Sequence, residues 1–296
     1  MFNLAAGRKW YFIISGVLAA FSLFFLLLPP GLHWGIEFTA GSTMTVQFQN
    51  EVDQADLRAE LADVGHPGAV IQRTGEGDYL LRLRAIDQAE KDQLEASLRN
   101  RFGELTVLDF YLVSPVVAQE VRRNAAIAVA AAVAGILLYI AWAFRKMPSP
   151  LRWGTCAVAA LLHDVLIVLG AFAFLGRFFG VQVDALFITA VLSVLGYSDN
   201  NMVVVFDRIR ENMKRGISKD FEAVVNRSLV DTLGRQLNTI ITVVLTILAI
   251  LLLGGVTIRY FMLALLIGVV VGTYSSLLLA SQLLVAWEKR SPTRRR

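Results

Sequence analysis

Two acidic side chains stand inside long apolar stretches of this 296-residue sequence. Asp164 follows His163 in one such stretch, and Asp199 interrupts the next one. At 1.5 Å per residue, Asp199 lies roughly 12 Å along a helix from Asp207, near the middle of a hydrocarbon layer about 30 Å thick. An acid at that depth costs on the order of 2.5–3.5 kcal/mol, so such a residue usually marks a proton or ion path.

His163 and Asp164 lie at a similar depth, about 16 Å along a helix from Trp153. A carboxylate and an imidazole both exchange protons near neutral pH in suitable surroundings. We therefore predict a polar seam inside a helix bundle, with Asp164 and Asp199 on neighbouring helices. The competing interpretation is that such polar groups only join helices by hydrogen bonds. It is stronger for His163 than for the two acids, because an acid is an expensive group for that purpose.

Further polar residues recur in the fifth and sixth apolar stretches. They are Asn238, Thr239, Thr242, Thr246, Thr273, Tyr274, Ser275 and Ser276. We interpret the hydroxyl groups among them as contacts between helices. Arg235 stands at the start of the fifth stretch, and hydropathy alone favours a boundary charge that snorkels to the membrane surface.

Asn201 stands two positions after Asp199 in the sequence, which corresponds to a rotation of about 200° around a helix. They therefore do not share a helix face. Either protein surrounds this helix on most sides, or the helix is distorted near Gly196. The sequence leaves both alternatives open.

The composition indicates a membrane protein, with 56% hydrophobic residues and a mean hydropathy of +0.58. A spanning helix needs roughly 20 mostly apolar residues, and six stretches meet that length. They are Trp10–Leu28, Ala125–Phe144, Gly154–Phe174, Ala185–Phe206, Gln236–Leu253 and Tyr260–Trp287. The first exceeds the roughly 7–15 residues of a signal-peptide core, and no Ala-x-Ala site follows it, so we expect an uncleaved anchor.

Basic residues gather in alternate loops, which predicts the orientation. One side holds Arg8, Lys9, Arg145, Lys146, Arg152, the stretch 208–235 and the tail residues 294–296. The other side holds little beyond Arg177 and Arg259. We therefore expect both ends of the chain in the cytoplasm. The net charge of +4 arises from these basic loops, so we discount a nucleic-acid partner. The sequence has a single cysteine, Cys156, which excludes a disulfide framework.

Residues 31–122 have a different pattern, typical of a folded domain outside the membrane. The expected elements are strands at 43–48, 69–73, 79–84 and 106–113, and amphipathic helices at 54–64 and 86–102. Gly75, Glu76 and Gly77 indicate a hairpin between the second and third strands. The order β-α-β-β-α-β favours a ferredoxin-like fold. The sequence thus predicts an all-α membrane bundle of six transmembrane helices carrying one α+β ferredoxin-like extracytoplasmic domain.

The predicted organisation has four parts. Residues 1–30 form the cytoplasmic N-terminus and first transmembrane helix, and 31–122 form the extracytoplasmic domain. Residues 123–288 form a five-helix transmembrane bundle with an interfacial cytoplasmic loop at 207–234. Residues 289–296 form a basic cytoplasmic tail.

Several motifs together carry a family resemblance. The longest combines Gly196, Tyr197, Ser198 and Asn200 with the string Val203–Asn212, which includes Asp207 and Arg208. Shorter matches lie at 35–39, 162–165 and Arg235. The motifs follow one another in the order found in SecF, and the chain therefore resembles SecF. SecF-type chains are protein-export membrane subunits of the SecD/SecF family, which belongs to the resistance-nodulation-division superfamily.

The resemblance implies an accessory subunit of protein export in the bacterial cytoplasmic (inner) membrane, surrounded by membrane lipid. It implies a SecD partner, association with the SecYEG channel, and use of the proton gradient to draw unfolded secreted polypeptide outward. No enzyme activity, cofactor or metal is expected. No G-x-x-x-x-G-K-[ST] motif for nucleotide binding is present in the sequence.

The chain departs from the family pattern at one position. That pattern has an acid where this chain has Asn201, together with the arginine found here as Arg235. The resemblance thus implies a proton pathway that includes Asp199, Asn201 and Arg235, beside Asp164 and His163. Either Asp199 has taken the role of the missing acid through a helix distortion, or a partner subunit supplies the acid.

Two other functions remain open. One is a structural partner subunit without a proton site of its own, which the amide at Asn201 favours. The other is half of a proton-driven small-solute exporter, although such exporters usually carry twice as many helices in one chain.

Overall fold

The structure, a computed structural model, describes residues 4, 7–73 and 77–290. The chain divides into a helical unit, Met1–His33 with Ile127–Arg296, and a mixed unit, Trp34–Ala126. The mixed unit begins three residues later and ends four residues later than the expected domain at 31–122. The second difference arises because α5 (Pro115–Ala143) begins well before the apolar stretch that it contains.

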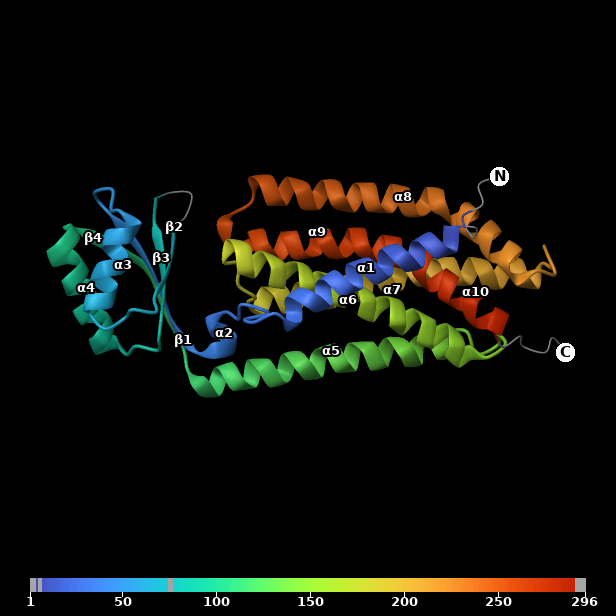
Figure 1. Cartoon of the computed structure of the whole chain (residues 1–296), viewed down its shortest axis with the longest axis horizontal. Helices are drawn as coiled ribbons and strands as arrows, with labels where there is room; N and C mark the ends of the chain where they lie inside the picture. The colour runs from blue at the N-terminus through green and yellow to red at the C-terminus, as the bar shows by residue number, and fades with distance from the viewer. Residues whose placement is uncertain (1–3, 5–6, 74–76, 291–296) are drawn as a thin grey trace. The chain divides into compact units, whose positions relative to one another are not determined.

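In the described residues, the helical unit contains six helices long and apolar enough to cross a membrane. They are α1 (Arg8–Leu27), α5, α6 (Pro150–Phe179), α7 (Ala185–Lys214), α8 (Phe221–Leu253) and the composite Arg259–Arg290. The last consists of α9 (Arg259–Tyr274), a π-helical turn (Ser275–Leu279) and α10 (Ala280–Arg290). These six helices follow the six predicted stretches in order, and they run side by side in Figure 1.

The loop expected at 207–234 requires correction. Helix α7 continues to Lys214 and α8 begins at Phe221, so only residues 215–220 connect them. The polar composition misled the prediction, because ion pairs one turn apart, such as Arg227 with Asp231, support polar helices. The Asp220 side chain also caps α8 by accepting a hydrogen bond from the backbone N–H of Glu222 at 3.2 Å.

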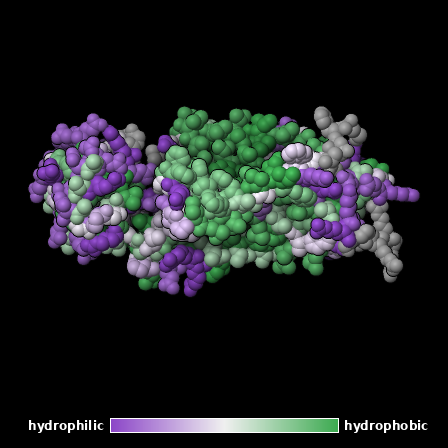
Figure 2. Space-filling model, in the orientation of Figure 1, coloured by the Kyte–Doolittle hydropathy of each residue, from purple (hydrophilic) through white to green (hydrophobic). Residues whose placement is uncertain are grey.

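The central helices of this unit are α6, α7 and the composite last helix. About half of the most apolar window is buried in each of them, between 44% and 50%, against 11% in α8 and 6% in α5. Figure 2 shows that apolar residues cover the outer surface of the helical unit on the visible face. This exterior suits lipid, so the helices are held by close packing and hydrogen bonds rather than by exclusion of water.

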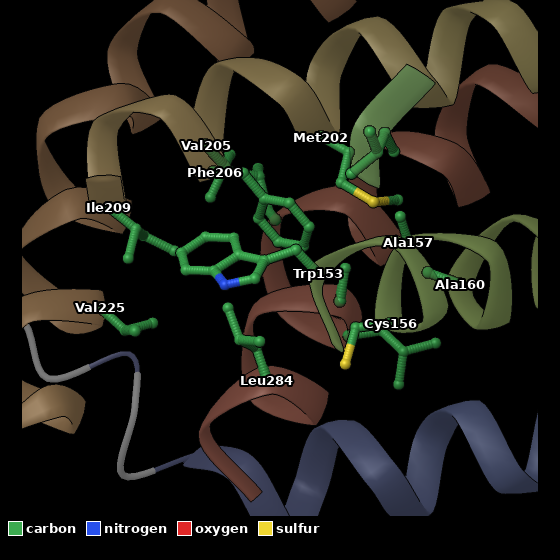
Figure 3. Close-up of a cluster of buried hydrophobic side chains, with 14 of the residues drawn as sticks. Trp153, Cys156, Ala157, Ala160, Met202, Val205, Phe206, Ile209, Val225 and Leu284 are labelled. Atoms are coloured by element: carbon green, nitrogen blue, oxygen red, sulfur yellow. The ribbon is translucent and has the colours of Figure 1, made fainter. Parts of the chain in front are cut away.

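An aromatic cluster lies in the core near the end of the bundle where α6 begins. Trp153 stacks on Phe144 with ring centroids 5.2 Å apart and meets Phe206 edge-on, also at 5.2 Å. Figure 3 shows the indole lying beside Phe206 and Ile209 of α7, with Leu284 of α10 nearby. Edge-on and stacked pairs fix the relative positions of the helices that carry them.

The mixed unit contains a four-stranded antiparallel sheet, the helices α3 and α4, and the single-turn helix α2. Its elements are α2 (Ile36–Thr39), β1 (Gly41–Phe48), α3 (Gln54–Asp63), β2 (Val70–Arg73), β3 (Tyr79–Leu83), α4 (Gln88–Phe102) and β4 (Leu105–Val113). The strand order is β2-β3-β1-β4. Each predicted strand and helix is present within two residues of its expected ends, whereas hairpin residues 75 and 76 lie outside the described residues.

Local sequence explains this unit. Alternate side chains of β3 are buried, as a sheet with one covered face requires, whereas β1 buries its first four residues and alternates only after them. Leu57 and Leu61 of α3, with Leu94 and Leu98 of α4, lie in the same core. At the start of α4, Asp87 and Glu90 form a reciprocal capping box that satisfies backbone N–H groups.

Candidate functional site

A fully buried carboxylate lies among the central helices. Asp164 of α6 has no exposed surface. The Ser275 hydroxyl donates a hydrogen bond to its Oδ2 at 2.7 Å, and His163 Nδ1 lies 3.4 Å from its Oδ1. A buried carboxylate needs such partners because water no longer solvates its charge. The group can hold a negative charge, or a proton, inside the bundle.

Close backbone approach completes this site. A Cβ added at Gly272 of α9 would overlap the Ser198 hydroxyl of α7 and lie 3.5 Å from Asp164 Oδ2. The glycine therefore lets α9 pack against α6 and α7 at this point. We call the group of Asp164, His163, Ser198, Gly272 and Ser275 the carboxylate site.

The π-helical turn begins at Ser275 itself. One additional residue in a helical turn changes the directions of the side chains around it, and such turns occur frequently at functional sites. Here consecutive residues Ser275 and Ser276 are both fully buried. The π-helical turn thus lies next to Asp164, and its first residue, Ser275, donates the shortest hydrogen bond to that carboxylate.

The structure decides between the alternatives for α7. The helix is regular around Gly196, so the expected distortion is absent there. Ser198 and Asn201 face the interior, Asp199 is half-buried, and Asn200 is exposed. Asp199 Oδ1 has no hydrogen-bond partner among the described residues. The structure thus shows no distortion that turns Asp199 into the place of Asn201, and the role of either residue in a proton pathway stays a prediction.

Arg235 lies on an exposed face of α8 and forms no ion pair with any described residue. Its neighbour Gln236 is 2% exposed and donates through Nε2 to the main-chain oxygen of Asn201 at 3.0 Å. At this position the side chain that α8 presents to α7 is thus the amide of Gln236, which sequence reasoning did not single out. Its only signal was one polar residue at the start of an apolar stretch.

Two other signature residues, Tyr197 and Arg208, contact neighbouring helices. Tyr197 lies 3.4 Å from the Thr273 hydroxyl. Arg208 donates to Asp231 Oδ2 at 3.0 Å through Nε and 2.8 Å through Nη2, joining α7 to α8. Asp207 is exposed and pairs with Arg210 on its own helix.

All three hydroxyl groups noted in the fifth stretch bond their own helix, so the expectation that they form contacts between helices is wrong. Thr239, Thr242 and Thr246 each donate to the carbonyl four residues earlier. These bonds satisfy the hydroxyl groups without joining helices. Among the described residues, no group of three or more His, Cys, Asp and Glu side chains could hold a metal ion.

The comparison with family models decides the family. The model for the C-terminal region of the protein export membrane proteins SecD/SecF matches residues 93–290, and the SecD/SecF GG motif matches residues 25–52. This chain belongs to the SecD/SecF family. With six apolar helices it is a multi-pass membrane protein, and its relatives support a role in protein export.

Relatives extend over almost the whole chain. The protein translocase subunit SecF of Thermobaculum terrenum is 44% identical, covering 98% of this chain and 95% of the relative. The protein translocase subunit SecDF of Thermus thermophilus is 35% identical over 98% of this chain, which spans only 39% of that longer relative.

A crystal structure of SecDF from the same organism, described as a translocon-associated membrane protein, agrees with this fold. It is 36% identical, with a TM-score of 0.86, and it covers 98% of this chain and 39% of the SecDF chain.

Proposed function

We propose that this chain is the SecF-type subunit of a bacterial protein-export translocase and that it pairs with a SecD partner. Together they use proton movement to draw unfolded polypeptide from the SecYEG channel. One observation carries the proton part: Asp164 is fully buried where α6, α7 and α9 meet, and Ser275 hydrogen-bonds it.

Asp164 is the proton-binding residue in this proposal. As a carboxylate it is held by the Ser275 hydroxyl, and once protonated it loses its charge and needs fewer donors. Because a buried charge is costly, binding and release of the proton change which packing of the three helices is preferred. The carboxylate site thus links a proton to helix movement. Movement of the helices would in turn move the mixed unit.

A SecD partner would contact this chain through α7 and α8, the helices that carry Asp199 and Arg235. Neither side chain forms an ion pair with a described residue. The SecDF relatives support this pairing, because the region matched by this chain is about two fifths of a longer chain named for both subunits. In this proposal the acid missing at Asn201 comes from SecD.

We further propose that both chain ends are cytoplasmic, as the distribution of basic residues indicates. The mixed unit then lies outside the bacterial inner membrane. We assign it a ferredoxin-like fold, which its β-α-β-β-α-β order and antiparallel strand order β2-β3-β1-β4 support.

The test compares Asp164→Asn with Asp199→Asn in proteoliposomes that contain the assembled export complex. The measured quantity is the export rate as a function of an imposed proton gradient. We expect Asp164→Asn to abolish the stimulation by the gradient, because an amide cannot bind and release the proton. Asp199→Asn should retain part of it.

Co-purification of the SecD partner serves as the assembly control for both variants. If both variants assemble and keep the full gradient dependence, this chain has no proton site and acts as a structural subunit. If only Asp199→Asn loses the dependence, the assignment of Asp164 is wrong.

A further inference from the structure

Two buried amide side chains meet between α7 and α8. Asn201 is 3% exposed and Gln236 is 2% exposed. Gln236 Nε2 donates to the main-chain oxygen of Asn201 at 3.0 Å, which brings the two residues into direct contact. The rest of α8 is largely exposed, so Gln236 is one of few side chains that this helix directs inward.

Each amide keeps one polar atom without a partner. Gln236 Oε1, an acceptor, and Asn201 Nδ2, a donor, have no hydrogen-bond partner among the described residues. A buried polar atom left unpaired costs about 1–3 kcal/mol. One water molecule in contact with both atoms would relieve this cost, since it would donate to the carbonyl oxygen and accept from the N–H group.

The amide pair lies one helical turn from the carboxylate site. Ser198 precedes Asn201 by three residues on the buried face of α7, and Ser198 and Asp164 both lie against Gly272. In the other direction, buried residues of α7 turn apolar at Val205 and Ile209. Polar contacts between α7 and α8 resume where Arg208 donates to Asp231 at 2.8 Å and Asn212 donates to Ser228 at 2.9 Å. The amide pair is therefore the polar neighbour of Asp164, with apolar buried residues of α7 between it and those contacts.

We propose that Asn201 and Gln236 form a water-binding site inside the bundle, which extends the carboxylate site toward α8. Neither amide gains or loses a proton, so any proton passes through the bound water and not through the side chains. The role in proton transfer rests on the proposed function of Asp164. The binding of water does not.

The test measures the reaction of single cysteines with a small, charged methanethiosulfonate. The reagent needs a thiolate in contact with water, and Cys156, itself buried, is first replaced by Ala. Asn201→Cys and Gln236→Cys in the full chain, in membrane vesicles, should react about tenfold faster than Val194→Cys. Val194 is the matched control, because it is buried on the same helix and only 1% exposed.

A second variant excludes access created by the smaller cysteine itself. Gln236→Leu, added to Asn201→Cys, removes the carbonyl oxygen that holds the water and should slow the reaction severalfold. Leu237→Met, at an exposed position of α8, should leave the rate unchanged. Rates equal to that of Val194→Cys, or no effect of Gln236→Leu, would overturn the proposal.

The outcome is independent of the export assay. Fast modification together with an Asp164→Asn variant that keeps the full gradient dependence would preserve the water site and reject the proton role of Asp164. Slow modification of the cysteines at 201 and 236, together with an Asp164→Asn variant that loses the gradient dependence, would reject the water site and preserve the proton role of Asp164.

Discussion

The two units of this chain differ in the polar residues that they bury and in the apolar residues that they expose. In the mixed unit, the core consists of residues such as Met44, Leu57 and Leu81, all fully buried. In the helical unit, buried positions include Asp164, Ser275 and further polar residues, whereas many large apolar side chains are exposed. Water expels apolar groups from one surface, and lipid accepts them on the other.

The difference shows what each unit can use its interior for. An apolar core in water supplies stability and resists change, because every lost contact is also a loss of buried apolar area. A lipid-facing bundle gains little from burying apolar groups, so its interior can carry hydrogen-bonding and ionisable groups that select between packings. The proton-binding residue that we propose, Asp164, accordingly lies in the interior of the helical unit.

The largest effect is expected from Leu81→Ala in the mixed unit. Leu81 is fully buried in β3, so its truncation should lower the free energy of unfolding by about 2–5 kcal/mol. Denaturant titration of a fragment that contains residues 34–114 measures this change. Leu108→Ala, at a half-exposed position of β4, is the control and should change stability by less than about 1 kcal/mol. Equal effects would contradict an apolar core behind one sheet face.

The next effect concerns close packing in the helical unit. A Cβ added at Gly170 of α6 would overlap the backbone of Ser22 in α1, so Gly170→Ala should force the two helices apart. We expect a loss of about 1–3 kcal/mol, measured by detergent-induced unfolding. Gly196→Ala, where an added Cβ meets nothing within 4 Å, should be neutral or slightly stabilising. A neutral Gly170→Ala would show that small residues are not what holds α1.

The smallest effects compare two arginines, one in each unit. Arg208 binds Asp231, which is 11% exposed, through two nitrogens, so Arg208→Gln should cost about 1–2 kcal/mol in the helical unit. Arg73 pairs with Glu51 in water, with both side chains more than half exposed. Arg73→Gln should therefore change the stability of the mixed unit by less than about 0.5 kcal/mol. Similar losses in both variants would contradict the different roles assigned to polar groups in the two units.

The sequence by itself determined the elements and the family. Apolar stretches of spanning length located the six helices, and alternation located the four strands, because strands with one buried face repeat every two residues. The motif around Asp207 indicated the family, which the comparisons confirmed. The stretch 207–234 was misread, since polar composition alone does not distinguish a loop from a helix stabilised by ion pairs.

Only the tertiary structure decided which polar residues share a site. Asn201 is buried, whereas Asp199 is only half-buried. The residue of α8 that contacts Asn201 is Gln236 and not the adjacent Arg235, which is exposed. The tertiary structure also brought Ser275 to Asp164, 111 positions away in the chain. The physical reason lies in the surroundings of the helices. Around a helix that packs on protein on one side and lipid on the other, apolar residues occur on every face, so periodicity does not reveal which side chains meet.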